Sequence, residues 1–454
     1  MGGVRKMNSS QEAENPLSRS FTMSSLLKFA FPTILMMLFM GLYTVTDTIF
    51  VARFVNTDAL SAMNIVCPVV NLIVGLGTML ATGGSAVIAW KMGAGEHVRA
   101  SLDFTLIGAA GGVRGVLIAG LGAAFADRLI WSLGASERLF PYCKAYLFVL
   151  LCFTPASIIQ VLFQNLIVTA GCPGIGMVLG ISAGAANILL DYVFMVPLRM
   201  GIRGAALGTG IGYLLPAVLG ALFFSAGVGS LRFRMPVLDM ALLAESCTNG
   251  FSEIVSQAAA AVTTFLFNRT MMGLLGEDGV AAITIMIYTQ FLLTVLFIGF
   301  SMGVAPVISY NYGKRDWAQL KKVFSIGVRF VAFASIAVFG AALVFGAPLV
   351  HVFAERETAV YEIARKGFLI FPFSFLFCGL NIYSSAMFTA LSNGKLSAIV
   401  SFLRTFGLIA VLLLILPELL GVTGVWLAVP AAELLTMITV LILLHQNRAR
   451  YHYA

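Results

Sequence analysis

Long apolar runs, separated by short polar or glycine-containing segments, dominate the pattern of this sequence. A helix needs about 20 predominantly apolar residues to cross a bilayer, and each run reaches that length. The pattern therefore predicts twelve membrane-spanning helices, at residues 26–52, 59–90, 102–125, 140–168, 175–198, 204–227, 243–271, 279–310, 323–349, 360–390, 396–416 and 422–445. The residues before the first run are polar, and we expect 1–22 to form a cytoplasmic tail that is mobile from Met1 to Ser20.

Composition supports a membrane location. Hydrophobic residues make up 59% of the chain and charged residues 11%, whereas soluble domains carry about 25% charged residues. Lys and Arg, which give a net charge of +8, favour the side that holds the two termini. This distribution is typical of cytoplasmic loops and predicts a multi-pass plasma-membrane protein with both termini cytoplasmic. Nucleic-acid binding is not expected.

The sequence lacks the motifs of membrane-bound enzymes and ATP-driven pumps. It contains no Walker A, HExxH or GxSxG pattern. Its six cysteines show neither a disulfide framework nor zinc-ligand spacing, so we interpret them as small apolar residues. We therefore predict a non-enzymatic, all-α membrane protein without a resident cofactor. No apolar patch is distinguished as an interface, and a monomer is expected.

An internal repeat organises the chain. At a fixed offset of 220 positions, residues of the first half match residues of the second: Asp58 with Asp278, Gly83 with Gly303, Gly93 with Gly313, Thr169 with Thr389, Gly174 with Gly394, Pro197 with Pro417, Gly201 with Gly421 and Gly204 with Gly424. Six spans, an even number, separate the copies, so both halves share one orientation. The repeat predicts two six-helix lobes, 23–230 and 231–454, related by a pseudo-two-fold axis along the membrane normal.

Ionisable residues inside spans mark the candidate chemistry, because burying them in a bilayer is costly. Asp47 lies in the first span with Tyr43 one turn before it, and Asn187 and Asp191 share one face of the fifth span. The two acids and the amide offer an oxygen-lined site for Na⁺ or a proton, and Tyr43 is a possible substrate or proton site. The alternative is a buried polar cluster that only holds helices together.

The repeat favours a specialised site in the first lobe. The counterparts of Asp47, Asn187 and Asp191 are Phe267, Gly407 and Val411, which lack these polar groups. A polar cluster that only holds helices together would not need to occur in one lobe alone.

Other polar residues of the second half are less clear from sequence. Glu253, with Gln257 one turn later, is a possible contact for a cationic substrate or a second proton site, or else a carboxylate near the membrane interface. Glu433 has no evident partner in sequence, and Arg404 either pairs with an acid or extends toward the interface.

Several segments resemble the MATE family of multidrug and toxic compound extrusion transporters. They are YTVTDTIFVARFV, DALSAMNIVCPV, GGSAVIAWKMGAGE, NILLDYVFM, GIRGAALGTGIG, DGVAAITIM and GVAPVISYNYGKRD. The resemblance implies two six-helix lobes around a V-shaped cavity and a cation site in the N-terminal lobe. Matched by position, that site consists of Asp47, Asn187, Asp191 and Thr209, with a backbone carbonyl from Ala205. Ala52 departs from the glycine usual in the first motif.

These observations together predict a secondary active transporter. It would export lipophilic organic cations in exchange for H⁺ or Na⁺, with small-molecule cations and the lipid bilayer as its partners. The alternative is a flippase for lipid-linked precursors. That activity needs a basic cavity for phosphate groups, whereas the first half of this chain is acidic inside its spans.

Overall fold

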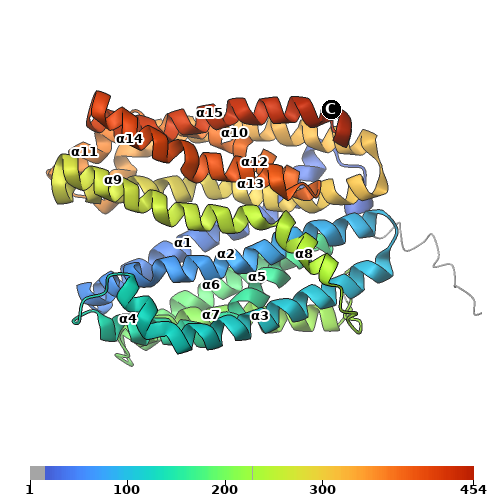
Figure 1. The fold of residues 1–454 in the computed structure, drawn as a ribbon, viewed down its shortest axis with the longest axis horizontal. Helices are drawn as coiled ribbons and strands as arrows, with labels where there is room; N and C mark the ends of the chain where they lie inside the picture. Colours follow the sequence, from blue (N-terminus) through green and yellow to red (C-terminus); the bar gives the residue numbers. More distant parts are fainter. Residues whose placement is uncertain (1–15, 228) are drawn as a thin grey trace, which may run out of the picture.

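The computed structural model describes residues 16–227 and 229–454. Helices form almost all of these residues (Figure 1). In chain order they are η2 (Pro16–Ser18), α1 (Met23–Phe54), α2 (Thr57–Gly93), α3 (His97–Ser132), α4 (Phe140–Cys152), α5 (Thr154–Thr169), α6 (Pro173–Met195), α7 (Ile202–Ser225), α8 (Met240–Asn249), α9 (Phe251–Lys314), α10 (Trp317–Phe353), α11 (Ala359–Gly367), η3 (Phe371–Ser374), α12 (Phe375–Ala390), α13 (Gly394–Phe402), the π-helix η4 (Leu403–Gly407), α14 (Leu408–Leu420) and α15 (Val422–Tyr451).

Twelve spans are confirmed once two broken helices are taken into account. Ten helical stretches of the described chain are long and apolar enough to cross a membrane, and α4 with α5 forms an eleventh span bent by 53°. Helix α9 has 64 residues, about 96 Å at the rise of an α-helix, which is far too long for one crossing. Gly276 interrupts it with a non-helical backbone (φ 66°, ψ −149°), so α9 contains two spans.

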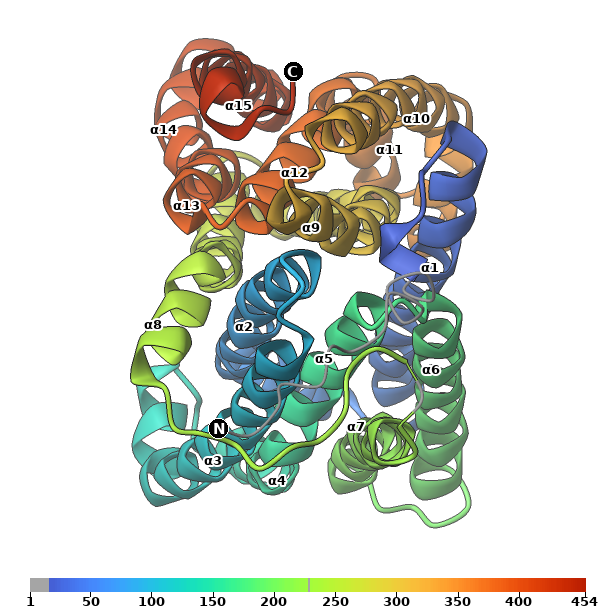
Figure 2. The ribbon, with the colours of Figure 1, turned by 90° about the vertical axis from the view of Figure 1, so that its right-hand side faces the viewer.

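The helices form two lobes (Figures 1 and 2). Helices α1 to α7 lie in one lobe and α9 to α15 in the other, with α8 bridging between them. The predicted boundary at residues 230 and 231 falls in the non-helical segment 229–239. We call the end of the bundle with the α7–α8 connection and the C-terminus the terminal end, and the other the far end.

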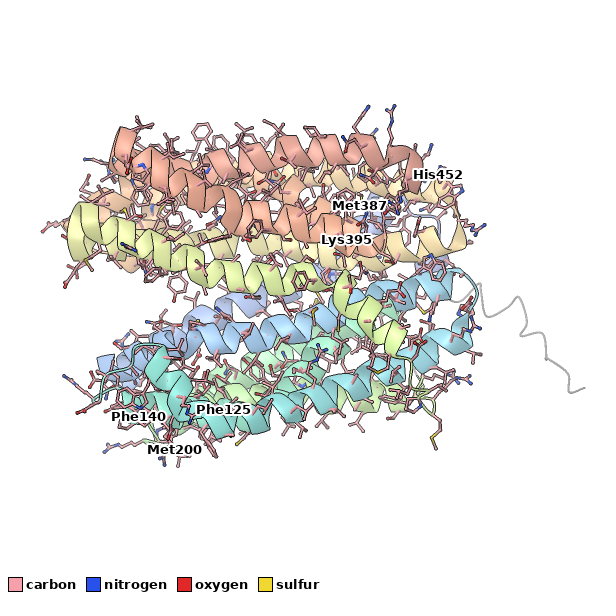
Figure 3. All side chains as sticks on the ribbon, viewed as in Figure 1. Phe125, Phe140, Met200, Met387, Lys395 and His452 are labelled. Atoms are coloured by element: carbon pink, nitrogen blue, oxygen red, sulfur yellow. The ribbon has the colours of Figure 1, made fainter. Side chains whose placement is uncertain are left out.

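The outer surface of the lobes is apolar, as expected for lipid contact. On α3, four side chains along one face are each about 60% exposed: Val113, Val116, Leu117 and Leu121. Aromatic residues gather near the far end, where Phe125 and Phe140 lie (Figure 3) and Trp131 stacks on Phe140 with ring centroids 4.8 Å apart. Such aromatic belts are typical of membrane–water interfaces.

Backbone geometry and contacts reproduce the 220-residue repeat. Gly201 before α7 and Gly421 before α15 adopt the same conformation, with φ 60° and ψ −142° in the first and φ 59° and ψ −137° in the second. Gly93 packs against the carbonyl of Tyr310, and its counterpart Gly313 packs against the carbonyl of Trp90. Tyr310 is the counterpart of Trp90 at the 220-residue offset, so the repeat converts each of these two contacts into the other. A pseudo-two-fold axis between α2 and α9 requires this reciprocity.

Near the terminal end, glycines allow the two lobes to pack closely against each other. We call Gly83, Gly93, Gly250, Gly303 and Gly313 the glycine seam. A β-carbon at any of them would overlap or crowd atoms of the opposite lobe: Gly83 faces Ser246, Gly250 faces Met79, and Gly303 faces Ala30 and Thr33. Only glycine allows helix backbones to approach this closely.

The prediction of a mobile segment from Met1 to Ser20 is wrong for its described part. Leu17 and Phe21 are 0% and 3% exposed and belong to the main hydrophobic core. Pro16 packs on Gly171, and the Phe21 carbonyl accepts a hydrogen bond from Gln319 Nε2 at 3.5 Å. Two apolar side chains in a short polar sequence were enough to dock this segment. Residues 1–15 of the predicted tail lie outside the described residues.

Candidate functional site

Three helices of the first lobe bring the predicted cation-site residues together. Helix α1 supplies Asp47, α6 supplies Asn187 and Asp191, and α7 supplies Thr209. We call these four residues the N-lobe site. Asp47 and Asp191 lie close enough to interact directly through their side chains, and Asn187 Nδ2 donates to Thr209 Oγ1 at 3.5 Å. Three members of the site are buried, since Asp191, Asn187 and Thr209 are 0%, 3% and 9% exposed, and Asp47 is partly exposed.

Several oxygens of the site have no partner within the described chain. Asp47 Oδ1, Asn187 Oδ1 and both carboxylate oxygens of Asp191 are buried without a hydrogen bond. None of the ion pairs found among the described residues includes Asp47 or Asp191. Buried polar atoms normally find partners, so this set of acceptors suits a cation or a proton.

The donor set suits a light, hard cation. It contains two carboxylates, an amide oxygen and a hydroxyl, all of them oxygen ligands. No group of three or more His, Cys, Asp or Glu residues with metal-site geometry occurs in the part of the chain that the structure describes. The arrangement therefore fits Na⁺ or H⁺ better than a transition metal, which prefers nitrogen and sulfur ligands.

Glycines on α6 and α7 make room for the site. A β-carbon at Gly208 would overlap Asp191 Oδ1, and one at Gly184 would lie 2.9 Å from the Tyr43 ring. At Gly212 it would lie 3.3 Å from the β-carbon of Asn187. These glycines were not predicted as part of the site. The signal was present, because Gly204, Gly208 and Gly212 recur every four residues on one face of α7.

Tyrosines surround the carboxylates. Tyr43 lies within electrostatic range of Asp47, as predicted from its place one turn earlier. Tyr146 of α4 and Tyr213 of α7, which were not predicted, also lie within range of Asp47. Ala205 is fully buried one turn before Thr209 on α7.

The second group of predicted residues does not join the N-lobe site. Gln257 packs on α2, where a β-carbon at Gly75 would lie 3.1 Å from its side chain. Glu253 interacts electrostatically with Arg404 of the second lobe. Glu433, for which the sequence offered no partner, is bound by Arg404 and Asn381.

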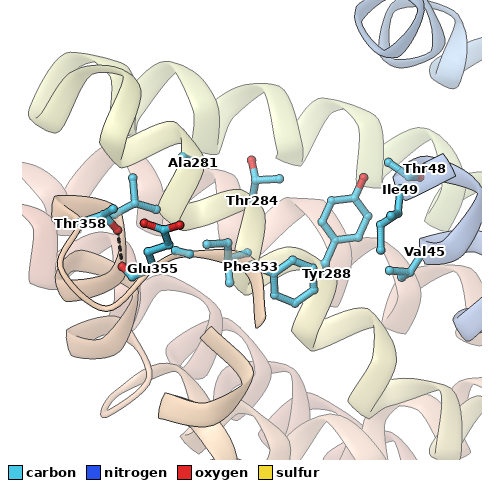
Figure 4. Close-up of a pocket in the computed structure, with 12 residues that line it drawn as sticks. Val45, Thr48, Ile49, Ala281, Thr284, Tyr288, Phe353, Glu355 and Thr358 are labelled. Carbon is cyan, nitrogen blue, oxygen red and sulfur yellow. Dashed lines mark hydrogen bonds between the residues drawn. The ribbon is translucent and has the colours of Figure 1, made fainter. Parts of the chain in front are cut away.

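A pocket opens between the lobes toward the far end (Figure 4). Helix α1 contributes Val45, Thr48 and Ile49 to its wall. The opposite wall comes from α9, the end of α10, the connection after it and the start of α11, with residues Ala281, Thr284, Ile285, Tyr288, Phe353, Ala354, Glu355, Thr358 and Val360. Glu355 is the acid among these lining residues, so the pocket is largely apolar with one negative group.

Enlarging Gly208 should damage the site without touching a polar residue. In Gly208→Ala the new methyl group must displace the Asp191 carboxylate, because the two would overlap. We expect gradient-driven transport by the reconstituted protein to fall about tenfold or more, since misplacement by about 1 Å can cost that much. Gly120→Ala is the control, because a β-carbon there meets no atom within 4 Å. Equal transport by both variants would show that Asp191 is not held where the structure places it.

Comparison with known proteins identifies the class. The MatE family model matches residues 32–193 and again residues 254–415, which covers more than half of the chain and reproduces the repeat. Multidrug export protein MepA of Staphylococcus saprophyticus subsp. saprophyticus is 22% identical, over 95% of this chain and 95% of its own length. The MepA protein of Staphylococcus aureus strain bovine RF122 / ET3-1 is 24% identical, with the same coverage of both chains.

Solved structures share the fold. A structure described as the outward-facing conformation of a multidrug resistance MATE family transporter of the MOP superfamily superimposes with a TM-score of 0.91. It is 20% identical and covers 99% of this chain and 100% of its own. A MOP superfamily transporter from Pyrococcus furiosus, whose description reports reverse polarity of the binding pocket, gives a TM-score of 0.90 at 20% identity, covering 98% of this chain and 99% of its own.

The twelve-span fold and the family match define a membrane transport protein, not an enzyme. The chain belongs to the MATE family. The resemblance inferred from sequence is thus confirmed, as are the two-lobed architecture and the multi-pass membrane location.

Proposed function

We propose that this MATE transporter is a secondary active antiporter that exports lipophilic organic cations in exchange for H⁺ or Na⁺. The observation that carries the proposal is the N-lobe site, where the buried Asp191 carboxylate interacts with the partly exposed Asp47 carboxylate. Each has an oxygen that is buried without a hydrogen-bond partner, and among the described residues neither forms an ion pair with a basic side chain. An uncompensated buried carboxylate is costly, so the site favours uptake of a cation. The multidrug export names of the relatives support the choice of cargo.

Helix α1 provides a physical link between ion and cargo. Asp47 faces α6 and the N-lobe site, while Val45, Thr48 and Ile49 line the pocket between the lobes. A cation drawn between Asp47 and Asp191 would pull on α1 and change the pocket wall. A ligand biases a conformational equilibrium only through different affinities for the two states, and this shared helix gives the ion and the drug such a difference.

The proposed orientation has both termini in the cytoplasm of a plasma-membrane protein that acts as a monomer. The terminal end, sealed by the glycine seam, would then face the cytoplasm, and the pocket would open outside. In this state the coupling ion enters from outside and the drug leaves. The apolar pocket with Glu355 at its wall suits a bulky cation, through area burial and charge.

Dye efflux from proteoliposomes tests the proposal. Vesicles loaded with a fluorescent lipophilic cation receive either a proton gradient or a sodium gradient of equal size. We expect one of the two gradients to accelerate dye movement about tenfold or more over the same proteoliposomes without a gradient, a typical strength of coupling between two ligands, with protein-free vesicles as the blank. If neither gradient moves the dye, the antiport proposal fails, and phospholipid scrambling in the same vesicles becomes the next measurement.

A further inference from the structure

The second lobe holds a buried charged cluster of its own. Arg404 Nε donates to Glu433 Oε1 at 2.9 Å, and the side chain of Glu433 is 2% exposed. Asn381 Nδ2 donates to the other carboxylate oxygen at 2.7 Å and to the Glu433 carbonyl at 2.9 Å. Arg404 also interacts electrostatically with Glu253 of α9. We call Glu253, Asn381, Arg404 and Glu433 the C-lobe cluster.

The cluster is built around a local departure from α-helix. Arg404 lies in the π-helix η4, between α13 and α14. Thr263 Oγ1 of α9 donates to the Thr405 carbonyl at 2.6 Å, which ties this wide turn to the neighbouring helix. Single π turns are uncommon and often occur at functional sites.

The repeat relates two residues of this cluster, Arg404 and Glu433, to positions beside the N-lobe site. Since 433 − 220 = 213 and 404 − 220 = 184, Glu433 corresponds to Tyr213 and Arg404 to Gly184. Tyr213 lies within electrostatic range of Asp47, and Gly184 packs on the Tyr43 ring. Both positions therefore border the N-lobe site in their own lobe.

The two lobes differ in how their acids are compensated. The N-lobe site holds Asp47 and Asp191 with unpartnered oxygens, whereas both oxygens of Glu433 are bound, one of them by a guanidinium. Arg remains charged at all relevant pH values. In the second lobe, the positive charge that compensates Glu433 is thus supplied by a side chain of the protein itself.

We propose that Arg404 is a tethered counter-ion that takes, in the second lobe, the part played by the mobile coupling ion in the first. It keeps that lobe permanently neutralised, so that only the N-lobe site exchanges ions during transport. Arg404 is therefore a positioning residue that sets how many ions move per drug molecule. This inference rests on the proposed ion site of the first lobe, but its test does not.

Cation-dependent stability of purified protein tests the inference with the N-lobe site removed. The background variant is Asp47→Asn/Asp191→Asn, whose apparent Tm should not change when NaCl replaces choline chloride. Adding Arg404→Gln should lower the Tm by about 10 °C in choline chloride, because one partner of a buried ion pair is gone. Na⁺, or a shift from pH 8 to pH 5, should restore at least about half of this loss in a saturable way, as expected for a ligand that binds the folded state.

Two variants separate charge compensation from simple packing. Arg404→Lys keeps a tethered positive charge and should show no response to Na⁺ or to pH. Arg404→Gln/Glu433→Gln removes both charges and should be equally unresponsive. Among the described residues, the charged and titratable groups that face Glu433 are Arg404 of η4 and Cys378 of α12, and Glu253 of α9 acts through Arg404. The variant Glu253→Gln tests whether the response to Na⁺ or pH comes from Glu253 instead of Glu433.

The outcomes are distinguishable. If Arg404→Gln is destabilised equally with and without cations, or if Arg404→Gln/Glu433→Gln is as unstable as Arg404→Gln, Arg404 acts through packing alone and the inference is overturned. Failure of the wild-type protein to exchange ions for dye would remove the proposed function but leave this binding measurement intact. If both hold, Arg404→Gln should raise the number of ions exchanged per dye molecule.

Discussion

Replacing Asp47 by Asn is expected to reduce gradient-driven dye export about 10- to 100-fold, the range of typical coupling between two ligands. The asparagine keeps the size of the side chain but removes the charge that attracts the ion. The Asp47 Oδ1 atom has no hydrogen-bond partner in the described chain, and the contact that the substitution changes is the direct side-chain interaction with Asp191. The measurement is the initial rate of dye efflux under the driving gradient, with dye binding and apparent Tm recorded beside it.

The same reasoning applies to Asp191→Asn, because both of its carboxylate oxygens are buried without partners. Asp127→Asn is the matched control. That carboxylate pairs with Lys144 at 2.9 Å on the surface, where its side chain is 56% exposed, and surface pairs contribute little. We expect the control to export dye at the wild-type rate. Full coupled export by Asp47→Asn would show that the ion binds elsewhere.

The double variant Gly93→Ala/Gly313→Ala is expected to open the sealed end of the transporter. A β-carbon at either position overlaps a carbonyl oxygen of the opposite lobe. Backbone atoms cannot move aside as a side chain can, so the helices α2 and α9 must separate. We expect efflux to fall about tenfold or more, because the state closed at the terminal end becomes rare.

Spin labels on opposite lobes measure this opening directly. Arg99 at the start of α3 and Arg315 after α9 are both exposed near the terminal end, and their replacement by labelled cysteines reports the distance between the lobes. The distance distribution should shift to longer values in the double variant. Gly120→Ala and Gly340→Ala, whose β-carbons would meet no atom within 4 Å, should leave it unchanged. An unshifted distribution in the double variant would show that the seam does not hold the lobes together.

The seam and the two polar clusters are consequences of one duplicated architecture. The same offset of 220 residues relates Gly93 to Gly313 and Gly201 to Gly421, and it relates Arg404 and Glu433 to Gly184 and Tyr213, which border the N-lobe site. Near the axis the copies retain matching glycines, because both backbones must approach each other. Away from the axis the copies diverge, with acids in one lobe and an ion pair in the other.

Much of the fold was predictable because membrane spans depend on local composition. A run of about 20 apolar residues specifies a crossing without reference to its neighbours, and all twelve predicted spans are present. The bend between α4 and α5, the π turn at Leu403–Gly407 and the docking of Leu17 were not predicted. The π turn and the docking of Leu17 involve residues far away in the chain, and the bend lies at Pro155, at the start of α5.

The candidate site, like the fold, was predictable from the sequence only in part. The sequence by itself determined the number of spans, the duplication and the one-sided placement of Asp47, Asn187 and Asp191, because these follow from hydrophobicity, residue spacing and the cost of burying charge. Only the tertiary structure decided that Gly208 shapes the Asp191 environment, that Gln257 and Glu253 lie apart from the N-lobe site, and that Arg404 compensates Glu433. These contacts join residues from different helices, and local sequence patterns do not specify how helices pack together.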